Sequence, residues 1–87
     1  GIAIDGTEIP FGTNTDGARV LFVMFKIAKD APSPTTLDTA AGVRVLFGTG
    51  GLVSQLVVTD RLTAIRAALD ATTWNCNGLA VTKPPAS

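Results

Sequence analysis

The residue best suited to covalent chemistry is Cys76, the single cysteine of this 87-residue chain. A catalytic thiol needs a base to take up its proton, and the sequence contains no histidine, the side chain that most often does so. A free cysteine usually behaves as a small buried hydrophobe. We therefore interpret Cys76 as a packed or incidental residue, with a catalytic thiol as the alternative, and we predict that the protein is not an enzyme.

Carboxylates are the other candidates for acid–base or metal chemistry. Paired catalytic carboxylates must face each other across one cleft, and the spacing of these residues indicates no such pair. A zinc site without histidine would have to consist largely of carboxylates, which is not the ligand set that zinc prefers. We therefore predict no catalytic residues, no cofactor and no metal site. The acidic residues are Asp5, Glu8, Asp16, Asp30, Asp38, Asp60 and Asp70.

A glycine-rich segment at residues 48–51 is a candidate for phosphate binding. A phosphate-binding loop opens a helix and carries a lysine followed by serine or threonine. This segment lacks that pair and precedes a strand-like run. We interpret it as the turn of a hairpin.

Three aromatic residues, Phe22, Phe47 and Trp74, are the predicted contact residues of an interface. Aromatic side chains carry a disproportionate share of the binding energy at protein interfaces. The alternative is that these rings fill the core of the domain itself.

The composition predicts association with other protein chains. Hydrophobic residues make up 46% of the chain and charged residues only 16%, and a domain this small has little interior in which to bury them. We expect a homo-oligomer or a larger assembly, with a well-packed monomer as the alternative. The formal net charge of +0 predicts neither nucleic acid nor a membrane surface as a partner.

Targeting signals are also not expected. The longest uncharged apolar run, residues 20–25, is too short to span a bilayer, and no basic segment precedes an apolar one. Because the sequence begins at Gly1 and not at methionine, it is open to interpretation as a processed product or a fragment of a longer protein.

The clearest predicted element is a helix over residues 59–72. Leu62, Ile65 and Leu69 have the spacing of one helical face, and several alanines raise the helix propensity. Thr59 or Asp60 is the predicted N-cap.

The first half of the chain predicts a hairpin followed by a second helix. Residues 2–9 indicate two short strands around an Asp5-Gly6 turn. Residues 18–30 indicate a helix, because a run of this length after a capping signal is too long for a strand, although a buried strand remains the alternative. Phe22 then lies near the charged side of that helix.

The remaining segments complete a small two-layer domain. Two prolines interrupt residues 31–36, and residues 37–42 are predicted to form a loop or short turn. Residues 43–47 and 52–58 indicate a second hairpin, and residues 79–81 a short edge strand. Residues 73–78 indicate a helix stop, in which Asn77-Gly78 is suited to positive φ. We predict one α+β domain over residues 1–82, in which two β-hairpins form an antiparallel sheet with two helices packed on one face, and a flexible tail or linker over residues 83–87.

The order of these segments resembles a known family. The opening segment 1–9, the Thr15-Asp16 start of the first helix and the last helix ending near an aromatic residue and Cys76 resemble a small domain of unknown function found in tail and tail-fibre-region proteins of tailed bacteriophages. The resemblance covers most of the chain. It implies a structural or assembly role in the virion, after synthesis in the host cytoplasm, and no known catalytic residues.

The predicted function is therefore that of a virion structural protein which self-associates or docks on a larger virion protein through apolar surface. The alternative is a small ligand- or partner-binding module within a larger bacterial or phage protein, in which case a cytoplasmic location applies. Its binding pocket is expected between the first helix and the second hairpin.

Overall fold

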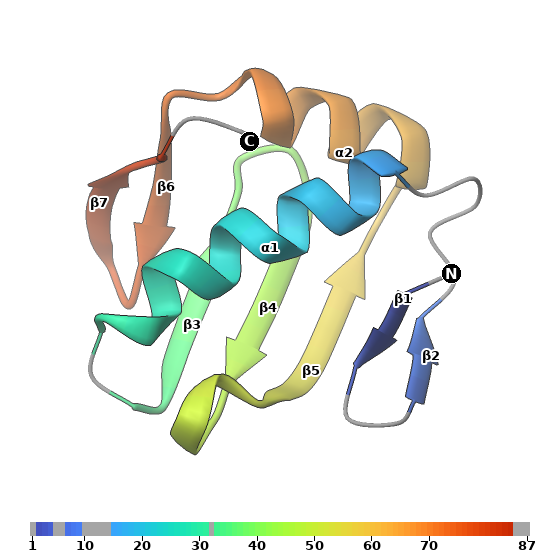
Figure 1. Ribbon diagram of the computed structural model, residues 1–87. Coiled ribbons are helices and arrows are strands. Elements are labelled where there is room, and N and C mark those ends of the chain that lie inside the picture. Colours follow the sequence, from blue (N-terminus) through green and yellow to red (C-terminus); the bar gives the residue numbers. More distant parts are fainter. Residues whose placement is uncertain (1, 5–6, 10–14, 32, 85–87) are drawn as a thin grey trace.

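A computed structural model describes residues 2–4, 7–9, 15–31 and 33–84 of the chain. It confirms the predicted α+β class, with two helices against an antiparallel sheet (Figure 1). In chain order the elements are β1 (Ile2–Ile4), β2 (Thr7–Ile9), α1 (Thr15–Lys29), β3 (Thr35–Asp38), β4 (Val43–Phe47), the 3₁₀-helix η1 (Thr49–Gly51), β5 (Val53–Val58), α2 (Arg61–Asp70), β6 (Thr73–Cys76) and β7 (Leu79–Thr82).

The main sheet has five strands in the order β5-β4-β3-β6-β7, with every neighbouring pair antiparallel. The predicted β4–β5 hairpin with its glycine turn and the predicted edge strand β7 are confirmed. The N-terminal hairpin is also present, but β1 and β2 form a separate two-stranded sheet and do not extend the main one. Its Asp5-Gly6 turn lies outside the described residues.

Two predictions for the sheet are wrong. Residues 37–42 were expected to form a loop, but Leu37 and Asp38 belong to β3, which pairs with β4 on one side and β6 on the other. Residues 73–78 were expected to end a helix, but residues 73–76 form β6. Both strands are only four residues long. Each pairs with the next strand along the chain and also with the other, and the β3–β6 pairing joins segments so distant in sequence that local composition gives little indication of it.

The core lies between the sheet and the two helices. Leu37, Val43 and Val45 of the central strands are fully buried. They alternate with side chains that point to the opposite face of the sheet, as the period of two in a strand requires. Figure 1 shows α1 crossing in front of β3 and β4, and α1 packs against both strands and against α2.

Helix α1 confirms the helical interpretation of residues 18–30, and the buried-strand alternative is wrong. The helix begins at Thr15, three residues before the predicted start. One side of it enters the core: Val20, Leu21, Val23, Met24 and Ala28 are all buried.

Helix α2 confirms the predicted helix over residues 59–72 and begins at the predicted cap. Asp60 is extended and its Oδ1 accepts a hydrogen bond of 3.0 Å from the Thr63 N–H. The predicted apolar face is partly wrong, because Leu62 is 67% exposed while Ala64, Ile65 and Ala68 are buried. The small alanine side chains let α2 approach the core closely, so the buried stripe runs through them and leaves Leu62 outside.

The C-terminal end of α2 is held by residues that follow it in the chain. The Lys83 ammonium donates to the carbonyl oxygens of Ala68 and Leu69, and the Trp74 indole N–H donates to the Ala68 carbonyl over 3.3 Å. A cation beside the last carbonyls of a helix also interacts favourably with the helix dipole. Lys83 is therefore part of the folded domain and not of a loose tail; residues 85–87 of that predicted tail lie outside the described residues.

Replacing Lys83 tests this anchoring. We expect Lys83→Met, which keeps most of the aliphatic stem, to lower the free energy of unfolding by about 1 kcal/mol, because two charge-assisted hydrogen bonds are lost. The measurement is urea unfolding followed by circular dichroism. The matched control is Arg66→Met, an exposed position on the same helix, where the change should stay within about 0.5 kcal/mol. Equal effects at the two positions would contradict a specific role for Lys83.

Candidate functional site

The face of the sheet that points away from the helices holds a shallow groove of about 870 Å³. Its lining includes side chains that alternate outward from neighbouring strands: Asp38 on β3, Arg44 on β4, Val57 on β5 and Asn75 on β6. The groove is therefore built by the central strands and by the turns at their ends.

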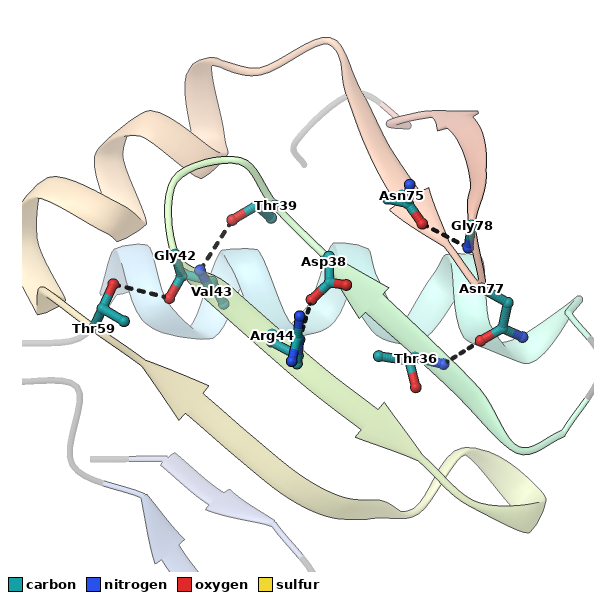
Figure 2. A network of polar contacts seen from close by, with 10 residues as sticks. All are labelled: Thr36, Asp38, Thr39, Gly42, Val43, Arg44, Thr59, Asn75, Asn77 and Gly78. Atoms are coloured by element: carbon teal, nitrogen blue, oxygen red, sulfur yellow. Dashed lines mark hydrogen bonds and ion pairs between the residues drawn. The ribbon is translucent and has the colours of Figure 1, made fainter.

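An ion pair occupies the middle of this face (Figure 2). Asp38 and Arg44 are direct register partners on β3 and β4, and the Arg44 Nε donates to the Asp38 Oδ1 over 2.5 Å. Their side chains are 35% and 62% exposed, so solvent screens the attraction and the pair contributes little to stability. The two charges neutralise each other and leave the groove without a strong field of either sign.

The β3–β4 turn beside this pair is fixed by local hydrogen bonds. The Val43 N–H donates to the Thr39 hydroxyl over 3.1 Å, and the Thr39 N–H donates to the Val43 carbonyl over 2.8 Å. Gly42 has a φ of 95°, which favours glycine, and its carbonyl accepts from the backbone N–H and the hydroxyl of Thr59 (Figure 2).

The β6–β7 turn at the opposite end is tied to β3 by Asn77. Its Oδ1 accepts a 2.7 Å hydrogen bond from the Thr36 N–H, and its own N–H donates to the Thr36 carbonyl over 3.0 Å (Figure 2). Asn77 and Gly78 have φ values of 50° and 88°, as a two-residue hairpin turn of type I′ requires. The predicted positive φ of Asn77-Gly78 is thus confirmed, in a hairpin and not in a helix stop.

The structure separates the three predicted contact residues. Phe47 and Trp74 are 1% and 2% exposed, so they fill the core, which is the alternative that the sequence left open. Phe22 is 48% exposed on α1. Cys76 is 7% exposed and belongs to the same core cluster as Phe47 and Trp74.

Phe25 and Leu52 are also exposed and were not among the predicted contacts. Phe25 on α1 is 39% exposed, and Leu52 of the β4–β5 connection is 57% exposed. The Phe25 ring lies against Gly51, the residue before Leu52, where a Cβ would overlap the ring. We call Phe22, Phe25 and Leu52 the α1–η1 patch. The helical spacing places Phe25 close to the edge of the buried face. The exposed fraction of its ring therefore depends on where η1 lies.

This packing also bears on the pocket expected between the first helix and the second hairpin. The Phe25 ring occupies the place where α1 meets η1, whereas the groove lies on the opposite face of the sheet. The groove is therefore a different place from the pocket expected from the sequence, which stays a prediction.

The described residues offer contact surfaces more readily than reactive groups. No group of three or more His, Cys, Asp or Glu residues among them is placed to hold a metal ion. Neither of the two described helices is long and apolar enough to cross a membrane. Comparison of the chain with protein families, curated proteins and solved structures finds no match.

Substitutions of Asn77 test the link between the β6–β7 turn and β3. We expect Asn77→Ala to lower the free energy of unfolding by about 2 kcal/mol, because it removes the acceptor for Thr36 and places a Cβ-bearing residue with no local polar group at positive φ. Asn77→Asp keeps an Oδ1 acceptor and gives up only the 3.5 Å hydrogen bond from Nδ2 to the Pro34 carbonyl, so it should lose least. Asn77→Gly loses both side-chain hydrogen bonds but adopts positive φ without strain, and it should lie between the two. Equal stability of the Ala and Asp variants in urea unfolding would contradict this account.

Proposed function

We propose that this domain is a non-enzymatic structural component of a bacteriophage virion, in the tail or tail-fibre region, and that it self-associates or docks on a larger virion protein through apolar surface. The observation that carries the proposal is the α1–η1 patch. It combines two exposed phenylalanines one helical turn apart with an exposed leucine that directly follows Gly51, the residue against which the Phe25 ring lies. Exposed aromatic and aliphatic side chains of this kind are typical of protein contact sites.

The α1–η1 patch is also held in place before any partner arrives. Gly51 has a φ of 77° and no side chain, so η1 approaches the Phe25 ring closely enough to support it. The Lys26 ammonium lies 4.7 Å from the centroid of the Phe22 ring, a cation–π distance that favours one position of that ring. Ordered aromatic side chains lose less conformational entropy when a partner binds, which favours association.

A second candidate function is supported by the groove on the open face of the sheet. Its volume of about 870 Å³ and its lining by Asp38, Arg44 and Asn75 match the size and mixed polarity of many ligand sites. In that case the domain is a small ligand- or partner-binding module. Its binding would depend on Arg44 and Asp38 and would be insensitive to changes in the α1–η1 patch.

The proposed association is tested by making the α1–η1 patch polar. We expect Phe22→Ser combined with Leu52→Ser to weaken association about tenfold or more. Phe25 is left unchanged because its ring packs on Gly51. The measurement is light scattering on a sizing column over about a hundredfold range of concentration.

Leu62→Ser is the matched control, since Leu62 is 67% exposed on α2, outside the α1–η1 patch. All variants should unfold within about 1 kcal/mol of the wild type. Association that the double variant leaves unchanged would argue against the patch as the contact surface. The virion role has its own test: mass spectrometry of particles purified from the source phage should detect the chain at a fixed stoichiometry.

A further inference from the structure

Strand β7 is an edge of the five-stranded sheet, and the residues that form it carry no charge, proline or bulge that would hinder pairing with another strand. Its four residues, Leu79–Thr82, include no charge and no proline, and Leu79 is 72% exposed. Natural edge strands are commonly blunted by charges, prolines or bulges. The other edge, β5, is protected in this way, because its register with β4 shifts between Leu46 and Phe47.

The direction of the free backbone groups on β7 follows from its pairing with β6. The Lys83 N–H donates to the Thr72 carbonyl over 2.8 Å, and Val81 and Thr82 are the register partners of Trp74 and Thr73. Hydrogen-bonded and non-hydrogen-bonded pairs alternate along an antiparallel ladder. Val81 and Lys83 therefore direct their backbone groups toward β6, whereas Ala80 and Thr82 direct theirs away from the sheet.

We propose that β7 pairs antiparallel with β7 of a second copy of this chain, about a two-fold axis at Val81, so that one continuous sheet runs through both copies. This rests on the self-association in the proposed function and adds a second contact surface, separate from the α1–η1 patch, through which two copies join. Ala80 of each copy lies opposite Thr82 of the other, and each of these two pairs exchanges both of its N–H···O bonds.

The outward groups of β7 are complementary to those of a second copy of the same strand. Ala80 and Thr82, the residues with outward backbone groups, are two positions apart. A two-fold axis at Val81 therefore places Ala80 of one copy opposite Thr82 of the other. Ala80 and Thr82 carry small, uncharged side chains on the open face of the sheet. Such side chains neither repel nor obstruct their counterparts, and a symmetric contact of this type closes at a dimer.

Amide hydrogen exchange measured by NMR tests the pairing directly. The amides of Ala80 and Thr82 should exchange quickly in dilute protein and become protected as the concentration rises about a hundredfold. Val81 and Lys83 are internal controls, because their N–H groups point toward β6 and should be protected throughout. Ala80 and Thr82 amides that exchange freely at every concentration would overturn the proposal.

Substitutions at the same two positions test the register. Ala80→Pro removes an outward N–H from each copy but no hydrogen bond to β6, and it should weaken dimerisation about tenfold or more. Ala80→Lys and Thr82→Glu should each weaken it through repulsion of like charges near the axis. A mixture of these two single variants should associate again, because the introduced lysine of one copy then faces the introduced glutamate of the other.

The outcomes separate the edge from the α1–η1 patch. Association that is insensitive to all three β7 substitutions overturns the edge pairing. If the double variant Phe22→Ser with Leu52→Ser then abolishes association, the proposed function still holds. Loss of association in the β7 variants, with recovery in the mixture, supports the edge pairing whatever the patch variants do. Failure of the mixture to recover overturns the register at Val81.

Discussion

The fold depends on the pairing of β3 along both of its edges. Without this four-residue strand, the β4–β5 and β6–β7 hairpins would be two separate ribbons, each too small to be stable alone. Leu37 gives β3 its anchor in the core, where its side chain is fully buried. Asn77 then connects the far hairpin to Thr36, 41 residues earlier in the chain. A long-range contact of this kind closes a large loop. The chain loses conformational entropy when the loop closes, and burial of the whole core offsets that loss.

The position of both helices on one face of the sheet explains where the candidate sites lie. Both helices cover the same face of the sheet, so the Asp38–Arg44 pair and the groove around it remain in solvent. On the side of α1 away from the core, Phe22 is exposed, and Phe25 is partly exposed although its ring packs on Gly51. A third layer of secondary structure could cover such rings, but the described elements of this small chain form no third layer. The exposed apolar side chains are thus a consequence of size and architecture together.

Sequence reasoning succeeded where the signal was local. The period of apolar residues and the Asp60 cap indicated α2, length decided for α1, and Asn77-Gly78 indicated a turn with positive φ. It failed where the answer depends on distant partners: β3 and β6 are strands because they pair with each other and with their neighbours. The candidate surface was predicted in part. Phe22 stands out by its place near charged residues, whereas no local pattern distinguishes an exposed Phe25 from a buried Phe47.

The burial of Cys76 gives the protein a built-in chemical reporter. Its thiol lies in β6 at 7% exposure, within the cluster that contains Phe47 and Trp74. Alkylating reagents act on an accessible thiolate, so modification has to wait until β6 separates from the core. The rate at which this single sulfur is labelled therefore follows the local opening of β6. Labelling of the natural cysteine thus measures how often β6 separates from the core, and no engineered cysteine is needed.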